Sequence, residues 1–92
     1  MRFEWDLRKT VRNRVKHGIS FEEAATVFGD PWGGITDDPR HSEAEQRHVL
    51  LGHSRAERLV AVMFTERGEA IRIISARLAT WRERKDDERG KS

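Results

Sequence analysis

The stretch AIRIISARLATWRER, residues 70–84, organises this chain because it joins a predicted strand to a predicted helix. Its first half is rich in β-branched isoleucine, which favours a strand over residues 70–77. Its second half contains Thr80, a good N-cap residue, with Glu83 three positions later at the spacing of a capping box. The sequence therefore predicts a C-terminal helix that starts directly after the strand.

Arginine side chains gather around this predicted junction. Strand alternation places Arg77 and Arg72 on opposite faces, which is not typical of an ordinary buried core strand. Arg82 and Arg84 follow at the start of the helix, so three guanidiniums around one junction predict an anion-binding site. The alternative is a solvated network with Glu83 and other acids, which would contribute little to stability. For Arg82 this alternative is at least as well supported.

A first helix is predicted near the N-terminus. Asp6 is a good N-cap residue and Gly18 a natural stop after the last turn. The apolar residues Leu7, Val11 and Val15 repeat every four positions, and we expect this stripe to pack against the domain. The rest of the helix is basic and should face water.

A second helix and four more strands complete the predicted elements. The helix should begin at Ser20, which has Glu23 at capping-box spacing, and end at Gly29. The four strands are expected over residues 3–5, 32–36, 47–52 and 59–64. The last of these, LVAVMF, is apolar on both faces, which is typical of a central strand covered on two sides.

The resulting order, β-α-α-β-β-β-β-α, predicts the α+β class. It describes a small, mostly antiparallel sheet with two N-terminal helices and one C-terminal helix. The length of 92 residues suits one domain, which we place at residues 1–84. The polar residues 85–92 (KDDERGKS) are expected to form a disordered tail.

The composition narrows the functional classes. The absence of cysteine excludes disulfides and thiolate metal sites. No apolar run approaches the roughly 20 residues of a membrane span, so we expect a cytoplasmic protein without membrane contacts. Two basic segments, residues 1–17 and 47–84, flank an acidic segment, residues 20–46. If the basic segments meet in space, their surface suits RNA, DNA or an acidic protein.

Histidine is the natural candidate for acid–base chemistry. Lys16 and His17 stand at the predicted end of the first helix, where they are either catalytic or a simple charge cap on the helix dipole. From the residues alone, the cap is the better supported reading. His48 and His53 are five apart on one strand and so on opposite faces, which argues against a shared metal. No nucleotide or metal motif is present, and no cofactor is predicted.

Three further residues are candidate RNA contacts. Trp81 lies among arginines and either stacks on an unpaired base or docks on the sheet. Arg47 and Arg67 lie near predicted strand ends, where an RNA contact and a solvated charge are both open.

Four motifs in this order resemble the BrnT family of bacterial toxins. They are FEWD (residues 3–6), KHGISFEEA (16–24), DPRHS (38–42), and RIISAR (72–77) followed by Thr80 and by RER at 82–84. The resemblance runs from about residue 3 to residue 84, nearly the whole chain. It departs from the family at Trp81, where members often carry arginine, and in the complete absence of tyrosine.

The resemblance implies a RelE-like ribonuclease toxin that cuts RNA and inhibits translation. The fold of such toxins agrees with the predicted order of helices and strands. Such toxins need no metal, because the RNA 2′-hydroxyl attacks the adjacent phosphate while basic side chains position it. The implied partner is a BrnA-like antitoxin carrying a DNA-binding domain, in a heterotetramer that reaches operator DNA only through the antitoxin.

Carried over by position, Lys16 and His17 match the KHG motif, and Arg77 and Arg84 match the C-terminal motif. The resemblance therefore makes these four the catalytic candidates, with His17 the preferred general base and Lys16 the next choice. The candidate RNA-binding residues are Arg47, Arg67, Arg82 and Trp81.

Two other functions remain open. One is a non-catalytic RelE-like module that serves antitoxin binding and operon control. The other is a DNA-binding domain, which is disfavoured because the basic groups gather about a strand and not on one recognition helix.

Overall fold

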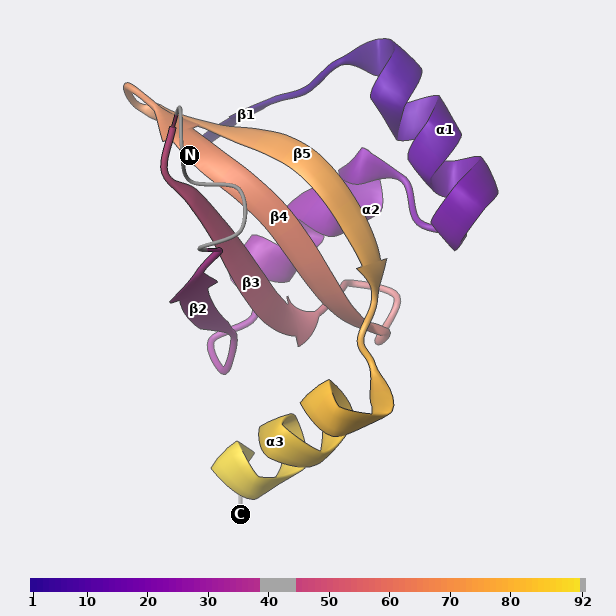
Figure 1. The fold of residues 1–92 in the computed structure, drawn as a ribbon, viewed down its shortest axis with the longest axis vertical. Coiled ribbons are helices and arrows are strands. Elements are labelled where there is room, and N and C mark those ends of the chain that lie inside the picture. The colour runs from indigo at the N-terminus through magenta and orange to yellow at the C-terminus, as the bar shows by residue number, and fades with distance from the viewer. Residues whose placement is uncertain (39–44, 92) are drawn as a thin grey trace.

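A five-stranded sheet with α1 and α2 packed on one side forms the body of the protein (Figure 1). The computed structural model describes residues 1–38 and 45–91. The elements are β1 (Arg2–Glu4), α1 (Leu7–His17), α2 (Phe21–Thr26), the 3-10 turn η1 (Val27–Gly29), β2 (Gly34–Asp37), β3 (Arg47–His53), β4 (Leu59–Arg67), β5 (Ala70–Leu78) and α3 (Trp81–Lys91). The predicted α+β class is confirmed.

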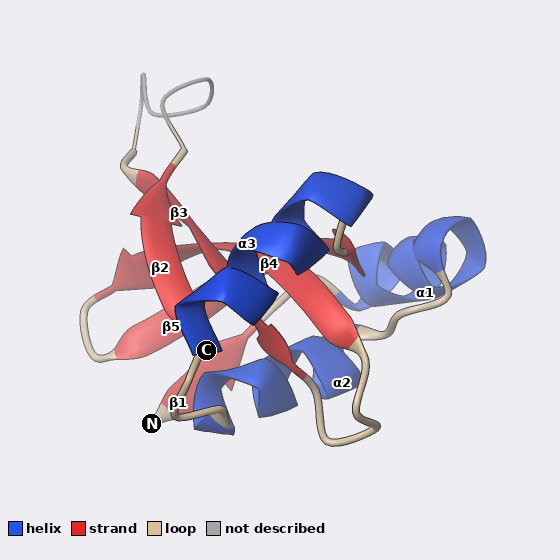
Figure 2. Cartoon of the chain, turned by 90° about the horizontal axis from the view of Figure 1, so that it is seen from below, coloured by secondary structure: helices blue, strands red, loops and turns tan. Residues whose placement is uncertain are grey.

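The sheet has the order β1-β5-β4-β3-β2, so the apolar strand β4 is central, as predicted. The pairs β2–β3, β3–β4 and β4–β5 are antiparallel. The short β1 pairs with β5 in parallel, with Phe3 opposite Ile71. The sheet is therefore mixed. A parallel pair needs a crossover connection, and the chain between β1 and β5 places α1 and α2 beside the sheet (Figure 2).

The hydrophobic core lies between the sheet and the segment from α2 to η1. Phe21 and Val27 from this segment pack against Val62 and Phe64 of β4, and all four are at most 2% exposed. Burying side chains of this size contributes roughly 1.5–3 kcal/mol each. The segment from α2 to η1 therefore packs against the sheet through its apolar side chains.

Strand β5 contains a β-bulge that changes its alternation. Met63 of β4 is opposite Ser75, but the next residue, Phe64, is opposite Ile73, which leaves Ile74 as an extra residue in β5. One extra residue shifts the side chains that follow it to the other face relative to strict alternation.

The bulge corrects the predicted placement of the arginines. Arg72 is opposite Thr65 and Arg77 is opposite Ala61, two residues of β4 with the same parity. Directly opposed residues share a face, so both arginines lie on the face of the sheet turned away from α2, together with Arg47, which also pairs with Thr65. We call this face, which carries Arg47, Arg72 and Arg77, the front face. The prediction that β5 carries arginine on both faces was wrong.

Helix α1 also faces the other way from the prediction. The stripe of Leu7, Val11 and Val15 is 76%, 63% and 84% exposed, whereas Thr10 and Asn13 are the buried residues of α1. Polar groups determine this orientation, because Thr10 Oγ1 accepts the Phe21 amide at 2.9 Å and Asn13 bonds the backbone of β5.

Helix α3 begins with the predicted capping box. Thr80 Oγ1 accepts the Glu83 amide at 3.2 Å, and Glu83 Oε1 accepts the Thr80 amide at 2.8 Å. The helix then continues to Lys91, so residues 85–91 are helical where a disordered tail was expected. Good helix formers such as lysine, glutamate and arginine explain the continuation. In the described residues, no helix is long and apolar enough to cross a membrane.

An ion-pair network ties α2 to the β3–β4 hairpin. Arg58 donates to both carboxylate oxygens of Glu23, through Nε at 2.9 Å and through Nη2, and the same Nη2 donates to the Gly18 carbonyl at 2.8 Å. Ser54 Oγ donates to Glu23 at 2.8 Å. The hydrogen bond from Arg58, and secondarily that from Ser54, lowers the pKa of Glu23 below its usual value.

This network should make stability depend on acid pH. Because the pKa of Glu23 is lower in the folded chain, its stabilising contribution is complete above the ordinary carboxyl pKa and is lost as pH falls through the folded value. Between about pH 5 and pH 3, the free energy of unfolding should therefore fall more steeply in the wild type than in Glu23→Gln. Urea unfolding at each pH measures both slopes.

Glu23→Gln should also lose about 1–2 kcal/mol at neutral pH, because it weakens bonds to a partly exposed arginine. Glu66→Gln, at an exposed position of β4, is the matched control and should parallel the wild type. Parallel curves for Glu23→Gln and the wild type would contradict the assignment.

Candidate functional site

A basic groove runs between α1 and β5. It has a volume of about 190 Å³ and contains two of the predicted catalytic residues, Lys16 and His17. Every charged side chain that lines it, in the described part of the chain, is basic. The lining residues are Lys9, Arg12, Asn13, Lys16, His17, Phe21, Ile74 and Ser75. We call it the α1–β5 groove, and its chemistry suits an anion.

Local sequence explains why α1 presents these cations. Asp6 caps the helix by accepting the Arg8 amide at 2.7 Å, and Gly18 ends it at φ 72° by donating to the Arg14 carbonyl. That positive φ favours glycine. The carbonyl groups at the end of α1 favour positive charge near Lys16 and His17.

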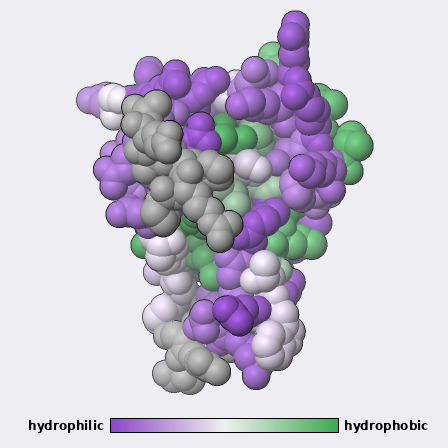
Figure 3. Space-filling model, in the orientation of Figure 1, coloured by the Kyte–Doolittle hydropathy of each residue, from purple (hydrophilic) through white to green (hydrophobic). Residues whose placement is uncertain are grey.

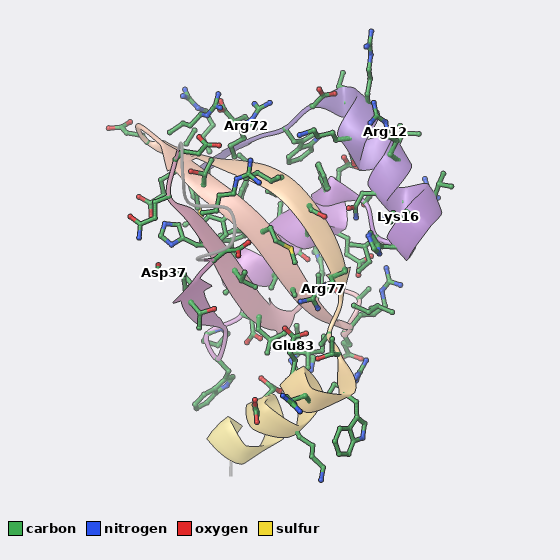
Figure 4. All side chains as sticks on the ribbon, in the orientation of Figure 1. Arg12, Lys16, Asp37, Arg72, Arg77 and Glu83 are labelled. Carbon is green, nitrogen blue, oxygen red and sulfur yellow. The ribbon has the colours of Figure 1, made fainter. Side chains whose placement is uncertain are left out.

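The groove includes two cations that the sequence analysis did not select. Lys9, Arg12 and Lys16 are spaced i, i+3, i+7, which places them on one side of a helix. Figure 4 shows Arg12 and Lys16 along the same helix. The spacing was available in the sequence, but it was interpreted only as a solvated basic face. No sequence pattern pointed to Ser75, because its position beside the groove follows from the bulge in β5.

Arg77, the third predicted catalytic residue, is in an ion pair. Its Nη1 and Nη2 donate to the two carboxylate oxygens of Glu83 at 2.7 and 3.2 Å. Figure 4 shows the two side chains pointing toward one another between β5 and α3. The hydrogen bonds from Arg77 are the main reason that the pKa of Glu83 is lowered. The side chain of Arg77 is 33% exposed, so it remains accessible to a competing anion.

The predicted cluster of Arg77, Arg82 and Arg84 is not assembled around one pocket. Arg82 lines a separate depression with Trp81 and Lys85, and Arg84 is exposed on α3. Trp81 is 71% exposed, with Lys85 Nζ 4.5 Å from its ring centre, so it does not dock on the sheet.

The two predicted arginines near strand ends differ in position. Arg47 lies on the front face opposite Thr65, and Arg72 flanks the same threonine from β5. Arg67 is at the end of β4, where Nη2 lies 3.8 Å from Glu45 Oε2. By its register in β4, Arg67 also belongs to the front face, but it lies at the far end of the strand, six positions from the Ala61 that pairs with Arg77.

A larger groove of about 420 Å³ lies between the front face and α3. Its floor includes Val49 and Leu51, and hydrophobic surface surrounded by hydrophilic residues is visible on this side in Figure 3. Its rim on α3 is acidic, from Glu83, Asp86 and Asp87. The acidic rim disfavours a phosphate, so the α1–β5 groove is the better anion site.

The two described histidines outside the groove each lie near a carboxylate. His48 Nδ1 lies 3.1 Å from Asp37 Oδ1, and His53 Nδ1 lies 3.7 Å from Asp30 Oδ2. In residues 1–38 and 45–91, no three histidine, aspartate or glutamate side chains come together as metal ligands. His41 and most of the DPRHS motif lie outside the described residues.

Comparisons with known proteins agree on one family. A family model described as the ribonuclease toxin, BrnT, of type II toxin–antitoxin systems matches residues 5–83. The chain is also similar to the crystal structure of the Brucella abortus ribonuclease toxin BrnT, with 26% sequence identity and a TM-score of 0.64. That similarity covers 87% of this chain and 97% of the Brucella chain. No curated protein sequence matches the chain.

Proposed function

Since the chain belongs to the BrnT family of ribonuclease toxins of type II toxin–antitoxin systems, we propose that it cuts cytoplasmic RNA without a metal ion and so inhibits translation. The partner that neutralises it is a BrnA-like antitoxin. The pair forms a heterotetramer that contacts operator DNA through the antitoxin alone.

The α1–β5 groove is the observation that carries this proposal. Lys9, Arg12 and Lys16 offer three cations along one side of α1, and His17 lines the same groove. Three cations at helical spacing fit successive oxygens of a phosphodiester backbone, and cations supply most of the affinity in nonspecific nucleic-acid binding.

The chemistry needs a base, an acid and charge stabilisation. His17 takes the proton of the RNA 2′-hydroxyl, whose oxygen then attacks the adjacent phosphorus. The bond to the 5′-oxygen breaks, that oxygen takes a proton from water, and the products are a 2′,3′-cyclic phosphate and a 5′-hydroxyl. Lys16 stabilises the additional negative charge on the phosphorane, and we assign Arg77 and Arg84 to neighbouring phosphates.

Cleavage of RNA by the purified chain in EDTA tests the proposal. We expect products that end in 2′,3′-cyclic phosphate, at a rate that EDTA does not change. The double variant Lys16→Ala, His17→Ala should lose this activity, which separates it from a contaminating ribonuclease. Cleavage that EDTA abolishes, or products with a 3′-hydroxyl, would overturn the metal-free mechanism.

Salt dependence tests the role of the basic groove. For single-stranded RNA, each phosphate contact changes the slope of log K against log salt by about 0.7. Lys9→Ala, Arg12→Ala and Lys16→Ala combined should therefore reduce the slope by about 2. Filter binding from low to moderate salt measures it. Arg2→Ala combined with Arg55→Ala removes exposed charge outside the groove and is the control. A slope unchanged by the groove variant would place RNA on another surface.

One observation favours the second candidate, a non-catalytic module for antitoxin binding. Arg77 is already neutralised by Glu83, although a phosphate clamp needs a free guanidinium. Antitoxin binding without growth arrest or RNA cleavage, with free RNA and with ribosomes, would support this candidate over the nuclease.

A further inference from the structure

Helix α1 presents an apolar stripe to solvent. Leu7, Val11 and Val15 are 76%, 63% and 84% exposed and repeat every four residues along the helix. At 1.5 Å per residue the stripe is about 12 Å long. Figure 3 shows hydrophobic surface at the edge of the molecule that α1 occupies. A continuous exposed apolar stripe is a feature of interaction sites, whereas single exposed apolar residues are ordinary.

Positive charge borders the stripe on both sides. At about 100° per residue, Arg14 falls on one side of it, and Arg8 and Arg12 fall on the other. Helix α1 contains no acidic residue between Leu7 and His17. The surface is therefore a narrow apolar line with arginine on either side, and it complements a helix with an apolar face between carboxylates.

We propose that this stripe, Leu7, Val11 and Val15 with its flanking arginines, is the docking site of an acidic amphipathic helix of the antitoxin. The inference rests on the proposed function for the identity of the partner, since a type II family implies an antitoxin. The apolar side chains anchor the partner helix, and its carboxylates pair with Arg8, Arg12 and Arg14.

Charge favours this occupant over two others. A second copy of the chain would bring two helices without acidic residues together, and like charges oppose such a contact. A lipid surface usually binds helices that insert aromatic or leucine side chains, whereas this stripe has one leucine and two valines.

The position of the stripe also explains inhibition. Arg12 borders the stripe and lines the α1–β5 groove. A partner helix on the stripe whose carboxylates reach Arg12 neutralises part of the charge that holds RNA. Docking and substrate exclusion then occur on one helix.

The test compares antitoxin binding by variants of the full chain. Val11→Ser combined with Val15→Ser removes two anchors without changing charge, and Ile35→Ser, at a 60% exposed position of β2, is the matched control. By isothermal titration with the purified BrnA-like antitoxin, the double variant should bind at least about 30-fold more weakly and the control within about twofold of the wild type. Unfolding midpoints should stay unchanged, because these side chains are exposed.

RNA cleavage provides the independent readout. The double variant should cleave at the wild-type rate and resist inhibition by the antitoxin. If neither the wild type nor the double variant cleaves RNA, but the double variant still binds the antitoxin more weakly, the docking site is supported and the nuclease function is contradicted.

Three results would overturn the docking site. The first is equal antitoxin affinity for the double variant and the wild type. The second is sedimentation of the wild type as a dimer and of the double variant as a monomer, which assigns the stripe to a second copy of the chain. The third is binding to vesicles of anionic lipid by the wild type and the control but not by the double variant, which assigns the stripe to a membrane surface.

Discussion

Replacing Arg77 by alanine is expected to lower kcat/KM for RNA cleavage by about 100-fold. The guanidinium stands at the end of β5, is one-third exposed and presents two donors in a planar arrangement that matches a phosphate as well as it matches Glu83. In this proposal, RNA competes with Glu83 for Arg77. Steady-state cleavage of a labelled RNA measures the loss.

Glu83→Gln separates this role from simple anchoring of α3. The amide oxygen of glutamine can still accept the Thr80 amide, so the helix cap is retained while the ion pair is lost. If Arg77 binds phosphate, this variant should bind RNA more tightly than the wild type, because its guanidinium is released. If Arg77 only anchors α3, both variants should lose activity to a similar extent, and that result would contradict the clamp.

Replacing Asn13 by alanine should lower the free energy of unfolding by about 3–5 kcal/mol, a large part of the 5–15 kcal/mol typical of a domain. Asn13 is 7% exposed, and its side-chain amide takes the place of a neighbouring strand along β5. Its Nδ2 donates to the carbonyls of Ala76 and Ile19, each at 2.8 Å, and its Oδ1 accepts the Ala76 amide at 3.2 Å. Alanine leaves all three backbone groups without this partner, at about 1–3 kcal/mol each.

Urea unfolding measures this loss, and hydrogen exchange at the Ala76 amide locates it. Arg14→Ala, at the next and exposed position of α1, is the control and should change stability by less than about 0.5 kcal/mol. A cost below about 1 kcal/mol for Asn13→Ala, or unchanged exchange at Ala76, would show that the edge of β5 does not depend on this amide.

Several features of the fold could be predicted because they depend on short stretches of chain. Thr80 and Glu83 are three residues apart and form the predicted capping box. The apolar run of β4 correctly indicated the central strand. Lys16 and His17 line the α1–β5 groove and stay predicted catalytic residues, whereas Lys9 and Arg12 were overlooked although their spacing placed them beside Lys16.

Local patterns were enough for the α+β class, the helix starts and the family resemblance, because caps, periodicity and motifs involve contacts within a few residues. Which face of a helix or strand is buried depended on contacts with elements far away in the sequence. Asn13 bonds Ala76 across 63 positions, and this pairing turns the apolar stripe of α1 outward. The bulge in β5 is defined against β4, and it brings Arg72 and Arg77 to one face. At α1, satisfying the buried backbone polar groups of Ala76 outweighed helical periodicity, and at β5 the register against β4 outweighed strict strand alternation. No single-segment pattern contains that information.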